Sequence, residues 1–119
     1  MEIKWIDHDA YTEAYVSGDL ADADIVSMED VPQTVNRRLF VNFNDVRQYN
    51  VSLSRRIGIA ERRLTRNDRV AVWSGDPVVF GLCRQAALMA RVRLGGNYGV
   101  FLDRDEAVRW LTEPLPAPK

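Results

Sequence analysis

A short apolar strand that leads directly into a helix, Arg69 to Val92, is the feature that most restricts the fold. Residues 69–73 (Arg-Val-Ala-Val-Trp) form an apolar run of strand length, and a Ser-Gly turn follows. Asp76 is expected to cap the next helix, with Pro77 at the first helical position, where its missing N–H costs nothing. The Leu-Gly-Gly-Asn run at 94–97 is a natural helix end. A strand that is followed directly by a helix in this way predicts an α/β domain.

The rest of the chain repeats this alternation. Strands are expected where apolar residues alternate with polar ones or form short runs, and helices where they recur every three to four residues. Strands are predicted at 2–6, 13–17, 38–43, 69–73 and 98–102, and helices at 20–30, 53–66, 77–92 and after Asp103. Gly18 is expected to end the second strand. The order ββαβαβαβα predicts about five strands in a mixed, mostly parallel sheet with four helices and an antiparallel N-terminal hairpin.

Length and composition suit one globular domain. The chain has 119 residues, of which 46% are hydrophobic, enough for a core without disulfides or metals. The longest strongly apolar stretch, 86–90, is too short to cross a bilayer, and residues 1–5 lack the start of a secretory signal. Cys83 is the only cysteine, so we expect a cytoplasmic protein without an internal disulfide. One domain is expected over 1–112, with 113–119 as a proline-rich tail.

The charges are divided between two parts of the chain. Residues 1–36 carry nine acidic and one basic side chain, whereas residues 37–93 carry twelve basic and four acidic ones. Two such segments could pair between subunits and form a homodimer, or they could neutralise each other across one domain surface.

Four short motifs of the second half occur in the same order in a known family. They are an apolar strand at 69–73, an FG-x-x-R helix start at 80–84, a VF strand at 100–101 and a closing EA-x-x-WL helix at 106–111. Over residues 38–112 the chain resembles the bacterial STAS/SEC14-type, SpoIIAA-like domains. The resemblance implies a small α/β sandwich with four helices. It also implies a non-catalytic regulatory or protein-interaction role, such as that of the anti-sigma-factor antagonists.

Ser52 lies where those antagonists carry a phosphorylated serine. Their loop ends in Asp-Ser-Ser-Gly, and residues 50–53 here read Asn-Val-Ser-Leu, so three of the four positions differ. The resemblance makes Ser52 a candidate phosphorylation site, whereas capping of the following helix accounts for the same serine without phosphorylation.

Arginines give the helix at 53–66 a basic outer surface. Its predicted core stripe is Leu53, Ile57, Ala60 and Leu64. The residues expected on the opposite side are Arg55, Arg62 and Arg66, flanked by Arg56 and Arg63, with Ile59 among them. This surface is either simply solvated or binds an acidic protein surface through Arg55, Ile59, Arg62 and Arg66. Nucleic acid is not expected as a partner, because the pI is about 5.8 and no aromatic platform accompanies the arginines.

The helix at 77–92 is apolar over more than half of its circumference. Phe80 and Leu88 lie towards the arc that Arg84 occupies. These three residues could cover another helix, line a small apolar pocket or form a dimer patch. A pocket would suit the alternative function that the SEC14 relation implies, binding of a small apolar or lipid-like ligand.

Catalytic and cofactor motifs are missing from the sequence. The turn at 75–81 lacks the phosphate-loop ending and the dinucleotide glycines, and Asp76 would place a carboxylate where a phosphate should bind. His8 is the only histidine, so residues 7–9 read as a solvated turn and not as a zinc site or catalytic triad. Cys83 is expected to be a buried small hydrophobic residue. We therefore expect no enzyme activity, no cofactor and no metal.

Overall fold

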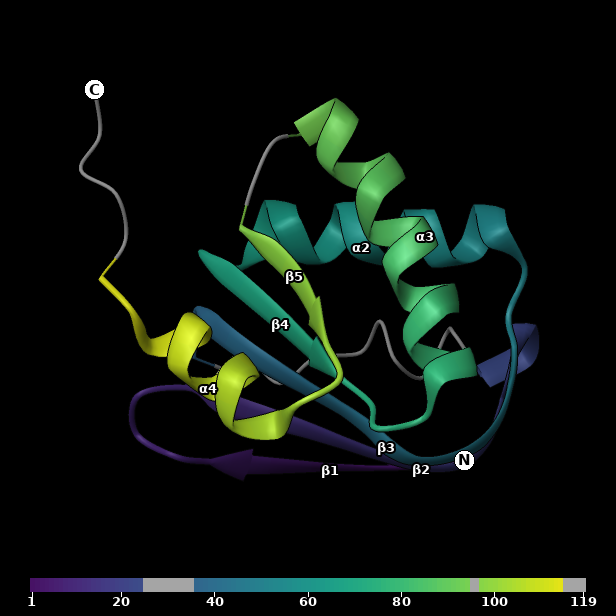
Figure 1. The fold of residues 1–119 in the computed structure, drawn as a ribbon, viewed down its shortest axis with the longest axis horizontal. Helices are drawn as coiled ribbons and strands as arrows, with labels where there is room; N and C mark the ends of the chain where they lie inside the picture. Colours follow the sequence, from purple (N-terminus) through teal and green to yellow (C-terminus); the bar gives the residue numbers. More distant parts are fainter. Residues whose placement is uncertain (25–35, 95–96, 115–119) are drawn as a thin grey trace.

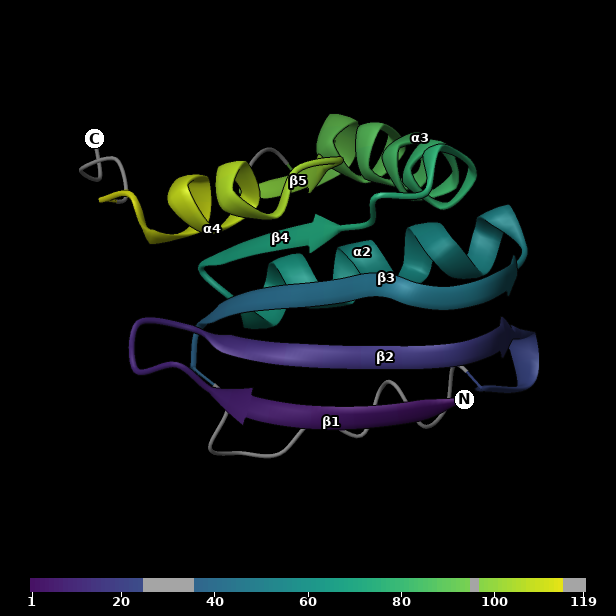
Figure 2. The ribbon, with the colours of Figure 1, turned by 60° about the horizontal axis from the view of Figure 1, so that its bottom comes forward.

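The computed structural model describes residues 1–24, 36–94 and 97–114; the side chains of residues 64–66 and 90–94 lie outside this description. It is an α/β structure with one five-stranded sheet in the order β1-β2-β3-β4-β5 (Figures 1 and 2). The strands are β1 (Glu2–Asp7), β2 (Thr12–Ala21), β3 (Arg38–Asn50), β4 (Arg69–Trp73) and β5 (Tyr98–Phe101). The helices are the 3₁₀ turn η1 (Asp22–Asp24) and the α-helices α2 (Leu53–Arg66), α3 (Pro77–Leu94) and α4 (Arg104–Thr112).

The strand pairing agrees with the expected α/β class and mixed sheet. β1 and β2 form an antiparallel hairpin, and the pairs β2–β3, β3–β4 and β4–β5 are parallel. Each parallel strand therefore lies beside the strand that precedes it in the chain, and β1 and β5 form the two edges of the sheet.

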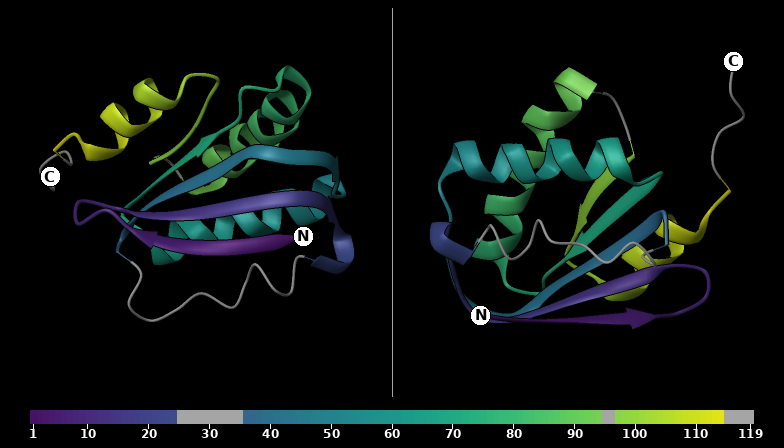
Figure 3. Two further views of the ribbon diagram at one scale, coloured as in Figure 1. Left: turned by 90° about the horizontal axis from the view of Figure 1, so that it is seen from below. Right: turned by 180° about the vertical axis from the view of Figure 1, so that it is seen from behind.

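The helices cover both faces of the sheet (Figures 2 and 3). Successive side chains of a strand point to opposite faces. In β3, Leu39 and Val41 therefore join the main core under α2 and α3, whereas Phe40 joins a smaller core under α4. Ala107 and Leu111 of α4 are completely buried in that smaller core.

The helix α4 is anchored at both ends. Asp103 accepts a hydrogen bond from the backbone N–H of Glu106 at 3.1 Å and so caps the helix, which begins after Asp103 as predicted. At the other end, Arg38 donates to the carbonyls of Leu111 and Glu113 at 2.9 and 2.7 Å. Cations at this end satisfy unpaired carbonyls and complement the helix dipole. The guanidinium of Arg38 thus ties the end of α4 to the start of β3.

Three sequence expectations about element boundaries are wrong. Gly18 does not end β2, which continues to Ala21. Gly18 has a positive φ of 89° and lies at an irregularity in the pairing of β2 with β3, which the strand accommodates without ending. β3 extends to Asn50 instead of ending at residue 43. The helix expected at 20–30 is not found in its described part, because Leu20 belongs to β2 and η1 follows; residues 25–30 lie outside the described residues.

Candidate functional site

A groove runs along β5, at the open edge of the sheet. It has a volume of about 410 Å³ and lies between α3 and α4. Phe80, Arg84 and Leu88 line it from α3, Phe101 from β5 and Trp110 from α4. The three residues that the sequence marked as an apolar-ligand or dimer patch therefore lie together, beside an edge strand that the sequence did not identify as an edge.

Among the described side chains, the α3 side of the groove is apolar with one cation. The side chain of Leu88 is 51% exposed, a large value for leucine. The guanidinium carbon of Arg84 lies 6.0 Å from the centre of the Phe80 ring. Among the described residues that line the groove, Arg84 is the only charged one. The groove thus combines exposed apolar surface with one positive charge.

Gly99 shapes the α4 side of the groove. A Cβ at this position would lie 2.8 Å and 3.0 Å from two ring atoms of Phe101 and 3.3 Å from Trp110. The rings of Phe101 and Trp110 lie 5.4 Å apart, centre to centre. A side chain at position 99 would displace this aromatic pair, so glycine is required for the observed wall.

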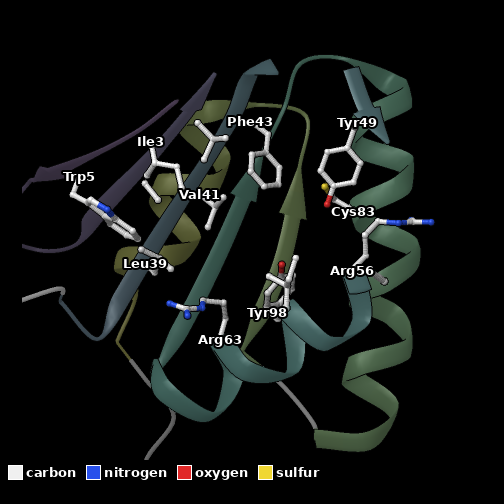
Figure 4. Close-up of a pocket in the computed structure, with 14 residues that line it drawn as sticks. Ile3, Trp5, Leu39, Val41, Phe43, Tyr49, Arg56, Arg63, Cys83 and Tyr98 are labelled. Carbon is white, nitrogen blue, oxygen red and sulfur yellow. The ribbon is translucent and has the colours of Figure 1, made fainter. Parts of the chain in front are cut away.

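A separate, small cavity lies inside the main core (Figure 4). Its volume is about 40 Å³, room for about one water molecule. Burial raises the pKa of the Cys83 thiol to about 12, against the opposing effects of the Tyr49 hydrogen bond and Arg56. Burial also raises the pKa of Tyr49 and of Tyr98. These groups are neutral at physiological pH, and Cys83 is buried as expected.

The helix α2 is rotated relative to the prediction. Arg56 and Arg63, expected on the flanks of the outer surface, are only 8% and 6% exposed. Arg56 donates to the carbonyls of Val51 at 3.0 Å and Leu82 at 2.6 Å, so its aliphatic stem covers the core while its head satisfies backbone oxygens. The sequence pattern missed this because a buried arginine counts as polar in a periodicity argument.

The predicted partner surface on α2 is therefore only partly present. Arg55 and Arg62 are exposed, as expected. The expectation that Ile59 lies on the outer side is wrong: it packs against the main core and lines the small cavity. The side chain of Arg66 lies outside the described residues.

The candidate phosphorylation site, Ser52, precedes α2 and is exposed. Its side chain makes no capping hydrogen bond, contrary to expectation. Its backbone N–H donates instead to the carboxylate of Asp22 at 2.9 Å. A phosphate on Ser52 would thus lie close to the negative charge of Asp22, which opposes it, and at the N-terminus of α2, which favours it.

A buried carboxylate that the sequence reasoning missed lies on the α4 face of the sheet. Glu13 in β2 is 3% exposed. Its oxygens accept hydrogen bonds from His8 at 2.8 Å, Asn42 at 2.9 Å and Arg104 at 3.2 Å. Burial opposes ionisation of Glu13, but these three hydrogen bonds outweigh it and hold its pKa below the usual value. The carboxylate is charged and held by three donors, an arrangement that stabilises structure and does not suit a general base at neutral pH.

The turn that holds His8 is consequently less solvated than expected. His8 is stacked on Tyr11, with ring centres 4.6 Å apart, and it is hydrogen-bonded to the carboxylate of Glu13. Within the described ranges, no group of three or more metal-ligating side chains could hold a metal ion. The Asp76 turn is a helix cap as expected, because its carboxylate accepts from the N–H of Val78 at 2.8 Å.

No protein-family model matches the sequence, and no curated protein matches it. Among the described residues, none of the helices is long and apolar enough to cross a membrane.

Proposed function

We propose that this chain is a non-catalytic regulatory domain that binds a partner protein in the groove between α3 and α4. The observation that carries the proposal is a sheet edge that lies in an apolar groove beside the cation of Arg84. Aromatic side chains and arginine are the residues that most often dominate the energy of protein interfaces, and this groove combines Phe80, Arg84 and Trp110.

The resemblance to STAS/SEC14-type, SpoIIAA-like domains supports the same class of function. Two of the four motifs that carry it, at 80–84 and 106–111, contribute Phe80, Arg84 and Trp110 to the groove. We therefore assign the chain to that family as a proposal, with partner binding and not phosphorylation of Ser52 as its functional feature.

Binding of a small apolar or lipid-like ligand is a weaker alternative. The interior cavity of about 40 Å³ is well below the roughly 300 Å³ at which ligand pockets begin. The groove is larger but lies at the surface, where one side of an apolar ligand would stay in water. The groove therefore suits a segment of a protein better than an enclosed lipid.

Photo-crosslinking in the native host tests the proposed surface. A photoreactive amino acid replaces Leu88 in the groove, Met89 beside it or Arg55 on α2, one at a time. Met89 is the matched control, because it is also an exposed apolar residue of α3 but does not line the groove. We expect a specific adduct at position 88 that Arg84→Glu in the same chain abolishes.

The other outcomes are equally informative. An adduct at position 55 alone would move the partner surface to α2. An adduct of twice the chain mass at position 88 would identify a second copy as the occupant of the groove. No adduct at any position would contradict a protein-binding function.

A further inference from the structure

We propose that the partner enters the groove as an extended segment that pairs with β5 as a sixth strand and places an acidic side chain against Arg84. This inference rests on the proposed function and specifies the mode of binding. It follows from the backbone of β5, the side chains beside it and the charge of the groove.

In the part of the chain that the structure describes, β5 pairs on one side only, and its backbone directs hydrogen-bonding groups to the outer side. The carbonyls of Asn97 and Phe101 accept from Val70 and Ser74 on the β4 side, at 2.8 and 3.2 Å. In a parallel ladder, alternate residues direct both their N–H and C=O to the same neighbour. Tyr98 and Val100 therefore direct theirs to the open side, two donors and two acceptors that an added strand can bond.

The two edges of the sheet differ in their protection against such pairing. Charged residues on an edge strand discourage the addition of another strand. The opposite edge, β1, carries Glu2, Lys4 and Asp7, whereas β5 reads Tyr-Gly-Val-Phe and has no charge, no proline and no residue with positive φ among those described. Among the features of its own sequence, the short length of β5 is what limits such pairing. β5, the edge strand that lies in the groove, is therefore more open to pairing with an added strand than β1.

The walls of the groove suit the alternating side chains of an extended segment. Phe80 and Leu88 lie on the α3 side, and Phe101 and Trp110 on the α4 side. Side chains of a strand point alternately to the two faces, so one set would contact the α3 wall and the other the α4 wall. Apolar residues on both faces of the added strand would therefore be buried.

Charge identifies the occupant as a partner with an acidic residue. Arg84 is exposed, and the contact that the structure gives it is with the Phe80 ring. An acidic side chain next to it would form a charge-assisted hydrogen bond. A second copy of β5 offers no acidic residue within the strand to meet Arg84. The occupant that fits the charge of the groove is therefore an acidic segment of a different protein.

Capped pentapeptides test the inference with the intact protein. The probe is Thr-Val-Glu-Val-Thr, compared with Thr-Val-Lys-Val-Thr and with two further versions of the glutamate peptide, one N-methylated at its first valine and the other at its glutamate. Binding is followed at millimolar peptide concentration through the backbone amide signals of Tyr98 and Val100 in ¹⁵N-labelled protein. In an added strand only alternate amides face β5, so the two methylations should differ.

We expect the glutamate peptide to shift both amide signals and to bind about tenfold more tightly than the lysine peptide. One N-methylation should weaken binding about tenfold and the other should leave it nearly unchanged. Arg84→Glu should reverse the preference between the glutamate and lysine peptides, whereas Gln85→Glu, on the same helix but outside the groove lining, should not.

Equal tolerance of both methylations, or no shift with the glutamate peptide, would overturn strand addition. If the crosslink at position 88 persists in that case, the proposed function stands and the partner binds through side chains alone. If the crosslink is also missing, the proposed function itself fails.

Discussion

Replacing Glu13 by glutamine tests the buried polar network, because the substitution keeps the side chain's size and removes its charge. The carboxylate accepts from Asn42, His8 and Arg104, and all three partners present donors to it. A glutamine has one acceptor oxygen and turns its NH₂ group towards at least one of these donors. One hydrogen bond to a charged group is lost and one buried donor is left unpaired.

The expected loss in free energy of unfolding at pH 7 is about 2 kcal/mol. A hydrogen bond to a charged group contributes about 1.5–3 kcal/mol, and Arg104 recovers part of this because its side chain is 39% exposed to water. For a chain of this length the change corresponds to a fall in Tm of roughly 8 °C. Urea unfolding followed by circular dichroism measures the free energy, and Asp19→Asn is the control. Within the described residues, the side chain of Asp19 makes an exposed ion pair with Arg47 at 3.9 Å, so its loss should change stability by less than about 0.5 kcal/mol.

The stability difference between the native protein and Glu13→Gln should depend on pH, and the pKa of Glu13 sets the direction. The pKa of Glu13 is lower in the folded than in the unfolded chain, so its stabilising effect is present above the unfolded pKa and is lost as pH falls through the folded value. The difference in free energy of unfolding between the native protein and Glu13→Gln should therefore shrink as pH falls below about 5, and it should vanish once pH is below the lowered folded pKa of Glu13. Equal stability at pH 7, or a difference that stays constant on acidification, would refute the role assigned to this carboxylate.

Three further predictions concern packing, helix anchoring and thiol reactivity. Gly99→Ala should lower the free energy of unfolding by about 1–3 kcal/mol, because the aromatic rings of the groove must move. Gly58→Ala in α2, with no atom within 4 Å of the new methyl, should raise it by up to about 1 kcal/mol, and thermal unfolding compares the two variants. Arg38→Met should destabilise the end of α4 by about 1–3 kcal/mol and speed its amide exchange, while Arg37→Met removes only an exposed ion pair and should leave that exchange unchanged. Cys83 should react with iodoacetamide at pH 8 roughly a thousandfold more slowly in the native than in the unfolded protein, because its pKa is raised from 9.0 to about 12. Mass spectrometry gives both reaction rates, and comparable rates would contradict the burial of Cys83.

The alternation of strands and helices could be predicted from the sequence because its causes are local. The apolar run at 69–73 and the caps at Asp76 and Asp103 are set by hydrogen bonds and side-chain directions within a few residues. The same locality explains the errors. Gly18 is a usual strand end, and only pairing with β3 shows that it lies in an irregularity inside a longer strand.

The helix α2 shows where periodicity fails. Its predicted core stripe assumed that arginine faces water, which holds for an isolated helix. The carbonyl of Val51 lies just before α2, and the packing of α3 against α2 brings the carbonyl of Leu82 beside Arg56. Burial of the Arg56 guanidinium is favourable because both carbonyls accept hydrogen bonds from it. Ile59 then turns towards the core and leaves the surface on which it was expected.

The sequence by itself indicated the five strands and the helices α2, α3 and α4, and it marked Phe80, Arg84 and Leu88 as residues of one helix face, because their spacing is a property of the helix alone. Only the tertiary structure decided that this face borders an open strand edge, since sheet order depends on which distant segments pair. The Glu13 network has the same origin: its donors lie 5, 29 and 91 residues away in the chain, and no local pattern relates them. Folding brings them together because a buried carboxylate is stable only where donors converge on it.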